Sequence, residues 1–333
     1  QDITFEKVYI STYGENKNVG TGTVTVTAMG NYGFADVTEN FSITPKSVTV
    51  SGITAADKVY DGTADVTLDC STAVFEGKAE GDELTVSAGG AFAAADADRE
   101  SAVVVNLSLT LGGKDKDNYV IDSANSQSET RAKISPAVLT VTPNAGQSKT
   151  FNTADPELTY TYSGAANGET PVFTGAPARA EGENAGEYTI NLGTLKLADG
   201  SGFKSNNYDL KLADTVVKFT INKAAYGDKT ALGSAMYGND GTVDLSGLIA
   251  EGGSAARGEI NDPDGVLTDT VTVSGTTLSF SFADDASKAG KTATVVVKVI
   301  DAANYDDYII TVTLTVENKL TPILEGDVTL TPA

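Results

Sequence analysis

Asn18-Val19-Gly20, followed by Thr23-Val24-Thr25-Val26-Thr27, opens a two-strand pattern that recurs four times along this chain of 333 residues. In each copy a tight turn leads into a Val- or Thr-rich strand, an Asn-Tyr pair follows, and a second strand returns. The returning strands carry an apolar residue at equivalent positions 91, 87 and 95 residues apart, namely Ile43, Ile134, Ile221 and Val316. A period near ninety residues predicts tandem domains rather than a solenoid of short repeats.

The opening turn and the Asn-Tyr pair are the two fixed points of the pattern. The turn recurs as Asn184-Ala185-Gly186 and Lys288-Ala289-Gly290, whereas residues 97–101 replace it in the second copy. The tyrosines of the four pairs are Tyr32, Tyr119, Tyr208 and Tyr305. Because each enters a closing strand, we expect it to pack in a corner with its hydroxyl bonded to nearby backbone, rather than to form a sugar-stacking platform.

These patterns predict an all-β chain of tandem Ig-like β-sandwich modules arranged end to end as a rod, with a β-grasp-like sheet as an alternative for residues 137–223. The expected segments are a partial module (1–46), three complete modules (47–136, 137–223 and 224–316), and a linker or the start of a further module (317–333). The partial module should expose one sheet face because it has no second sheet. Short helical turns are expected at 91–97, which is rich in alanine, and at 243–248.

Composition excludes several classes of function. The net charge of −22 argues against nucleic-acid binding and against anionic membrane surfaces, since both require clustered Lys and Arg. No run of eighteen apolar residues is present, so no membrane insertion is expected from this fragment, and any export signal or anchor should lie outside it. Cys70 is the single cysteine; the alternation before it predicts a buried structural residue, and an intrachain disulfide is impossible.

Residues 58–68 begin a segment that resembles the YDG repeat of large bacterial surface proteins, named for the triplet Tyr60-Asp61-Gly62. The similarity continues through Gly113 and Asp117-Asn118-Tyr119, and the departure from the family lies at 95–101, where such repeats have an Asn-Val-Gly-like turn. Gly62 should take a positive φ in the Asp-Gly turn.

Residues 137–223 resemble the MBG module of bacterial adhesin-like proteins. The matching stretches are Lys149-Thr150-Phe151, Asp155-Pro156-Glu157-Leu158-Thr159-Tyr160, Gly175-Ala176-Pro177, Asn184-Ala185-Gly186-Glu187-Tyr188 and Asn207-Tyr208. Phe151-Asn152 replaces the usual Tyr-Gly, and we expect the turn to be kept because Asn tolerates left-handed geometry. Residues 224–316 resemble bacterial Ig-like repeats more loosely. These resemblances imply a segment of a large surface protein.

The chain offers few candidates for chemistry. It contains no His, so it can form neither a Ser-His or Cys-His pair nor a metal-imidazole cluster, and we expect no enzyme activity and no cofactor. Loop carboxylates at Asp262 and Asp264, and at Asp115 and Asp117, are candidates for Ca²⁺, although Lys116 opposes a cation. Turn-forming Asx residues are the alternative reading of both loops.

Two further candidates follow from residue type. Tyr160, Tyr162 and Tyr188 are the first choice for an exposed aromatic patch that binds a ligand, with core packing as the alternative. Lys149 or Lys229 could join Asn222 or Asn318 in a self-made isopeptide bond, by analogy with other bacterial surface stalks.

The predicted function is a non-enzymatic stalk or spacer segment of a bacterial cell-surface adhesin-like protein, located outside the cell. Its expected partners are neighbouring modules of the same chain, and the chain is expected to be monomeric. The alternative is a binding module in which one repeat recognises a host glycan, mucin or matrix protein. An exposed aromatic or acidic patch would favour this alternative.

Overall fold

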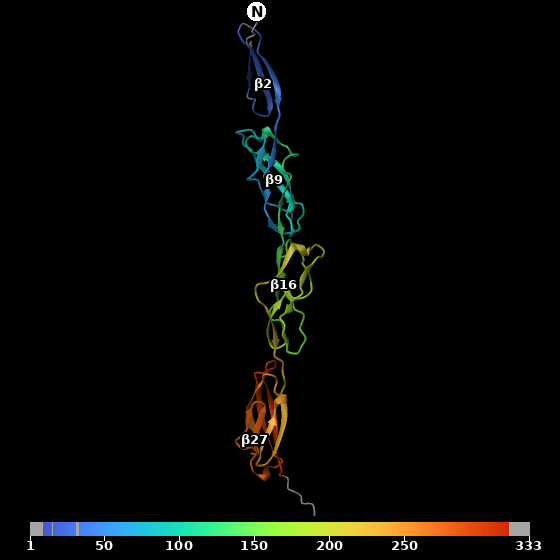
Figure 1. The fold of residues 1–333 in the computed structure, drawn as a ribbon, viewed down its shortest axis with the longest axis vertical. Helices are drawn as coiled ribbons and strands as arrows, with labels where there is room; N and C mark the ends of the chain where they lie inside the picture. Colours follow the sequence, from blue (N-terminus) through green and yellow to red (C-terminus); the bar gives the residue numbers. More distant parts are fainter. Residues whose placement is uncertain (1–8, 15, 31–32, 320–333) are drawn as a thin grey trace, which may run out of the picture. The chain divides into compact units, whose positions relative to one another are not determined.

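The computed structural model describes residues 9–14, 16–30 and 33–319. Among these residues every regular element is a β-strand or a single turn of 3-10 helix (Figure 1). The all-β prediction is confirmed. No helix in the described part of the chain is long and apolar enough to cross a membrane.

The chain forms two compact units. The first comprises residues 1–141, 162–174 and 196–211, and the second comprises residues 142–161, 175–195 and 212–333. The third module (137–223) therefore contributes strands to both units.

The first unit begins with an antiparallel sheet of β1 (Tyr9–Tyr13), β2 (Gly20–Ala28) and β3 (Val37–Ile43). All of β1 and nearly all of β3 are exposed, as expected for a sheet without a second layer.

The second module (47–136) follows with β4 (Lys46–Ser51), β5 (Thr54–Ala55), β6 (Lys58–Val59), β7 (Leu68–Asp69), β8 (Val74–Glu76), β9 (Thr85–Phe92), β10 (Val103–Gly112), the turn η1 (Lys116–Asn118), β11 (Tyr119–Ile121), β12 (Glu129–Ala132) and β13 (Ile134–Ser135).

The third module has no α-helix across its described residues, and its strands form three small sheets, β16-β14-β21, β15-β22-β19-β18 and β17-β20, instead of one β-grasp sheet. Its elements are β14 (Ala137–Pro143), β15 (Ser148–Thr150), β16 (Tyr160–Ser163), β17 (Val172–Thr174), β18 (Ala178–Arg179), β19 (Gly186–Asn191), β20 (Lys196–Ala198), the turn η2 (Ser205–Asn207), β21 (Tyr208–Leu212) and β22 (Lys218–Asn222).

The fourth module (224–316) is a two-sheet sandwich with sheets β23-β29-β28-β25 and β24-β27-β26. Its core includes Leu245, Phe280, Val295 and Leu314, all at most 1% exposed. Its elements are β23 (Lys229–Met236), β24 (Asp240–Asp244), the turn η3 (Ser246–Leu248), β25 (Ser254–Asn261), β26 (Thr272–Ser274), β27 (Thr277–Ser281), the turn η4 (Ala286–Lys288), β28 (Thr292–Ile300) and β29 (Tyr308–Glu317).

The recurring two-strand pattern is confirmed in all four copies. Each Val- or Thr-rich strand pairs antiparallel with its returning strand, as β2 with β3, β10 with β12, β19 with β22, and β28 with β29. In the second and third copies a strand that follows the Asn-Tyr pair joins another sheet: β11 pairs parallel with β4, and β21 lies beside β14.

Each complete module is closed by a parallel pair between an early strand and its last strand. The pairs are β6 with β13, β15 with β22, and β23 with β29, and the registers place Lys58, Lys149 and Ala235 opposite the equivalent residues Ile134, Ile221 and Val316. Two residues further along the early strands lie Tyr60, Phe151 and Tyr237. These three aromatic residues therefore occupy equivalent positions at the end of their modules.

Three local expectations have different outcomes. The helical turn at 243–248 is confirmed in part, as η3. The turn at 91–97 is wrong, because Ala91 and Phe92 pair with β10 and this strand pairing overrides the helical preference of alanine. Cys70 is half-buried rather than buried, because β7 ends at Asp69 and leaves the thiol in the following turn.

Candidate functional site in the joints between modules

A buried asparagine connects the third module to the second. Asn207 is 1% exposed, and its side-chain Oδ1 accepts a hydrogen bond of 2.8 Å from the backbone N–H of Ala97. Its Nδ2 donates to Asp96 Oδ1 at 3.0 Å. The hydrogen bond from Asn207, followed by one from Lys204, lowers the pKa of Asp96. Both ends of the amide are satisfied, as a buried polar group requires.

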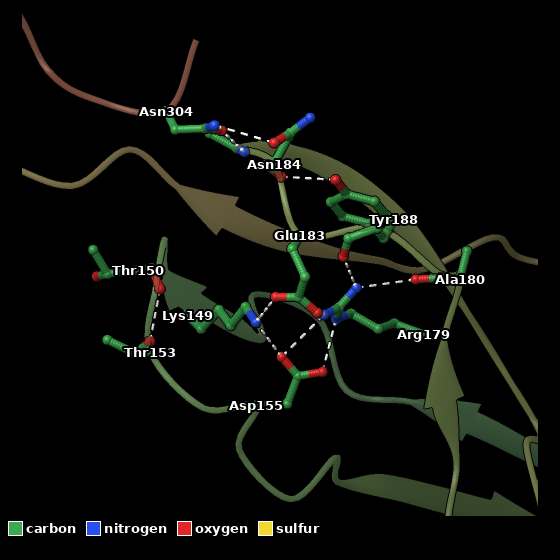
Figure 2. Close-up of polar contacts among 12 residues, drawn as sticks. Lys149, Thr150, Thr153, Asp155, Arg179, Ala180, Glu183, Asn184, Tyr188 and Asn304 are labelled. Carbon is green, nitrogen blue, oxygen red and sulfur yellow. Dashed lines mark hydrogen bonds and ion pairs between the residues drawn. The ribbon is translucent and has the colours of Figure 1, made fainter. Parts of the chain in front are cut away.

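The same contact recurs at the next joint. Asn304 Oδ1 accepts from the backbone N–H of Ala185 at 2.7 Å, and its Nδ2 donates to Asn184 Oδ1 at 3.1 Å. Figure 2 shows the two asparagine side chains facing each other. Asn304 is 7% exposed, so this amide too is largely withdrawn from water.

A third copy joins the partial module to the second. Asn118 Oδ1 accepts from the backbone N–H of Val19 at 2.8 Å, and Nδ2 donates to Asn18 Oδ1 at 3.0 Å. We call this arrangement the asparagine clasp: the Asn of an Asn-Tyr pair binds the backbone N–H and the preceding side chain of a loop in the previous module. The first two joints lie within the first unit, and the third lies within the second unit.

The clasp explains why the opening turn and the Asn-Tyr pair recur in the sequence, a role that sequence reasoning missed. The opening turn and the Asn-Tyr pair look like parts of one hairpin, yet Asn118, Asn207 and Asn304 each bind the opening turn of the previous module. Asp96-Ala97 fills this place in the second module, so the departure at 95–101 keeps the contact. The repeated Asn before each Tyr was a signal for this role, but its partner lies about one module away in sequence.

The Tyr of the pair fixes a turn within its own module. Tyr119 and Tyr208 hydroxyls accept from the backbone N–H of Ala79 and Ala166, both at 2.9 Å. Each alanine begins an Ala-x-Gly-x turn whose Gly, Gly81 or Gly168, has a positive φ. The expected corner role is confirmed for these two tyrosines.

The expectation for Tyr305 is wrong, because Tyr308 occupies the corner in the fourth module. Its hydroxyl accepts from the Ala250 N–H at 2.7 Å. The closing strand β29 begins at Tyr308, three residues after the Asn-Tyr pair, which leaves Tyr305 in the loop that faces the previous module. Tyr32 lies outside the described residues.

The residue that ends each Ala-x-Gly-x turn differs among modules. It is Asp82, Glu169 or Gly253, and the tyrosine hydroxyl donates to the carboxylate where one exists, at 2.7 Å for Asp82 and 2.9 Å for Glu169. In the fourth module Tyr308 donates instead to the Leu248 carbonyl at 2.7 Å. The hydrogen bond to Asp82 raises the pKa of Tyr119, and burial raises the pKa values of Tyr208 and Tyr308.

Each of the two later joints also contains an aromatic pair. Tyr60 packs edge to face on Tyr208 with ring centroids 5.4 Å apart, and Phe151 packs on Tyr305 at the same distance. The Tyr60 hydroxyl also donates to Glu169. Gly62 has a φ of +79°, and a Cβ there would lie 2.7 Å from the Cβ of Asn167 in the third module. Tyr60 and Gly62 of the Tyr60-Asp61-Gly62 triplet therefore face the next module.

An ion cluster holds the loop to which Asn304 binds. Lys149 and Arg179, with side chains 4% and 7% exposed, both contact the carboxylates of Asp155 and Glu183, as Figure 2 shows. Hydrogen bonds from Arg179 and then Lys149 lower the pKa of Asp155, and those from Lys149 and then Arg179 lower that of Glu183. Because Glu183 directly precedes Asn184, the cluster fixes the platform of this clasp. Asn152 in the adjacent turn has a φ of +65°, which confirms the expected left-handed geometry.

The loop aspartates proposed for Ca²⁺ are occupied by protein donors. Both oxygens of Asp262 accept backbone N–H groups, from Val266 and Leu267, at 2.8 Å. Asp264 lies near two lysines, with its carbonyl bonded to Lys288 and its carboxylate 3.7 Å from Lys291. In the other loop Asp115 accepts the Glu83 N–H at 2.8 Å, and Asp117 pairs with Lys116 at 3.1 Å. Within the described residues no three His, Cys, Asp or Glu side chains gather.

The three candidate tyrosines lie on two sheets. Tyr160 and Tyr162 lie on β16, where Tyr162 is 44% exposed and its ring centroid is 5.5 Å from that of Phe173. Tyr188 lies on β19, where the Arg179 guanidinium is 5.1 Å from its ring and its hydroxyl donates to the Asn184 carbonyl at 2.7 Å. Tyr188 thus supports the loop that Asn304 binds.

The Lys149 amine pairs with two carboxylates, Asp155 at 2.7 Å and Glu183, and hydrogen bonds to both raise its pKa. An isopeptide bond at Lys149 stays a prediction. Lys229 lies opposite Ile310 on β29, far from Asn318, which follows the other end of that strand. Its ammonium lies 4.5 Å from the Tyr226 ring.

Fold and joints together define a class: a chain of tandem all-β, Ig-like modules linked by recurring contacts between neighbours. Comparison with protein families gives two of the modules their names. Residues 44–127 match the YDG domain, and residues 139–218 match the MBG domain of the YGX type. The chain therefore contains a YDG domain followed by an MBG domain, as the sequence predicted. Both domains indicate a repeat region of a cell-surface protein.

A search of curated protein sequences finds no match to this chain. Among solved structures, four domains of Drosophila N-cadherin are 8% identical, with 91% of this chain and 85% of that chain covered and a TM-score of 0.29. A variant of the titin domains I67–I69 is also 8% identical, with 90% and 93% covered and a TM-score of 0.29. Similarity at this level carries no argument about function.

Proposed function

We propose that this chain is a non-enzymatic spacer in the stalk of a large bacterial cell-surface adhesin-like protein, located outside the cell. The observation that carries the proposal is the asparagine clasp at all three joints. A spacer can hold a distant domain in place only if neighbouring modules have a fixed orientation. Here the side-chain amide of an asparagine bonds the two modules at each of the three joints. The YDG and MBG domains support placement in a surface repeat region.

Charge and bonding fit the same proposal. The net charge of −22 disfavours self-association, so we propose that the chain is a monomer whose partners are the neighbouring modules. No cofactor is required, because the contacts at the joints are made by protein groups.

Small-angle X-ray scattering of residues 1–333 tests the spacer. A compact chain of this length should have a radius of gyration of about 20 Å. Four modules in line, each about 30 Å long from strands of eight to ten residues, should give about 35 Å. We expect the larger value, in calcium and in chelator alike. A value near 20 Å would contradict the spacer.

The second candidate is a binding module for a host glycan, mucin or matrix protein. It is favoured by Tyr162, whose exposed ring lies beside the half-buried ring of Phe173, because an exposed aromatic face can stack on a sugar ring. Immobilised mucin and glycans are suitable probes. Binding by the wild-type chain that is lost in Tyr162→Ala would support a binding module, and equal binding by both chains would exclude this surface.

A further inference from the structure

The turn acids of the second and third modules contact both their own tyrosine and the previous module. Glu169 accepts the hydroxyl of Tyr208 on one oxygen and that of Tyr60, from the YDG domain, on the other. Asp82 accepts the hydroxyl of Tyr119, and its other oxygen lies 3.6 Å from Lys17 Nζ of the partial module. Each acid thus has a donor that belongs to its neighbour.

The third joint has neither the turn acid nor the donor from the previous module. The turn of the fourth module ends in Gly253 instead of an acid, and the residue equivalent to Tyr60 is Phe151, which has no hydroxyl. The ring contact is retained, since Phe151 packs on Tyr305 as Tyr60 packs on Tyr208. Across three joints, then, a donor is present where the following module carries an acid, and absent where it carries glycine.

We propose that this donor–acid pair is a recognition element that determines which module can follow which. The end of the YDG domain fits a module with an Asn-Tyr pair and an Ala-x-Gly-x turn ending in a carboxylate. The end of the MBG domain fits one whose turn ends without an acid. The asparagine clasp is common to all three joints and uses a backbone N–H, so it attaches neighbouring modules without regard to their side chains. The donor–acid pair differs among joints, so it determines which neighbours are compatible.

Mismatched joints are disfavoured for a physical reason. A turn acid placed against Phe151 would be partly desolvated with one donor missing, and a Tyr60 hydroxyl placed against Gly253 would have no carboxylate acceptor. Buried groups left unpaired cost more than the matched bond gains, so the mismatch provides specificity. Gly253 also has little room for a side chain, because a Cβ there would lie 2.9 Å from the Ala250 carbonyl oxygen.

Hydrogen exchange of the Ala97 amide in the full chain tests the pair, because this N–H is bonded across the YDG–MBG joint and is released when the joint opens. We compare wild type with Tyr60→Phe, Glu169→Ala and the double variant. Each single change should accelerate exchange at Ala97 about tenfold, and Tyr60→Phe should add nothing once Glu169 is replaced. Two amides serve as controls: Phe92, bonded to Ala64 within the YDG domain, and Ala185 at the third joint.

Additive effects in the double variant, or no acceleration in either single variant, would overturn the proposal. If Glu169→Ala also accelerates Phe92, the YDG domain is disturbed, and Glu169→Met replaces it as a variant of similar length that has no carboxylate or amide oxygen. With this variant Tyr60→Phe should again add little. The outcome is independent of the proposed spacer, since a binding module would need ordered joints as well.

Discussion

Asn207 is the buried asparagine of the YDG–MBG joint. Its amide is buried and bonded at both ends to the previous module. Replacing it with alanine removes two hydrogen bonds and leaves the Ala97 N–H without its acceptor. We expect Asn207→Ala to lower the free energy of unfolding by about 1–3 kcal/mol, measured by urea denaturation. Asn106→Ala, an exposed asparagine on β10 within the YDG domain, is the control, and an equal loss in both variants would contradict a special role for Asn207.

Residue roles could be predicted only where the partner is local. The corner roles of Tyr119 and Tyr208 follow from their place at the start of a strand, and their hydroxyls bind turns about forty residues away in the same module. The role of Asn207 could not be predicted, because its partners are 110 residues away in another module. Tyr305 was misassigned because the sequence does not show that β29 begins three residues later.

At the scale of elements, the ion cluster between β15 and β18 should make stability depend on pH. Asp155 and Glu183 have lowered pKa values in the folded chain, so the unfolded chain binds more protons as the pH falls. Their contribution is complete above the unfolded pKa values of about 3.9 and 4.3 and is lost as the pH falls through the lower folded values.

We therefore expect Asp155→Asn to be less stable than wild type by about 1 kcal/mol from pH 8 to pH 5, a modest value because solvent screens Asp155. The difference should shrink below about pH 4, and comparing the two chains at each pH removes the effect of the overall charge. The exposed pair Glu187–Lys218 provides the control Glu187→Gln, with little effect at any pH. A difference for Asp155→Asn that persists at pH 3 would contradict the assignment.

The Val- and Thr-rich strands are sufficient to predict the antiparallel hairpins, because the paired strands, such as β2 with β3 and β28 with β29, are adjacent in sequence. The parallel closing pairs were not predicted. Each joins strands from opposite ends of a module, and nothing local in sequence determines that choice. Residues 91–97 show the same limit, since strand pairing at long range overrode a local preference.

At the scale of the whole chain, the ninety-residue period predicted tandem modules, and the family matches to YDG and MBG domains agree with it. The period could not show that the opening turn of one module contacts the Asn-Tyr pair of the next. A repeat aligned with itself places the opening turn and the Asn-Tyr pair in every module, but it does not reveal that the first three turns bind the asparagine of the module that follows.

Hydrogen exchange at the three clasped amides, Val19, Ala97 and Ala185, measured together in the full chain, tests the central claim most directly. We predict that all three are protected, Ala97 most and the exposed Val19 least, and that Asn118→Ala, Asn207→Ala and Asn304→Ala each accelerate only their own partner by tenfold or more. Wild-type exchange at the rate of an unstructured peptide, or amides indifferent to loss of their asparagine, would show that the clasps do not hold the joints.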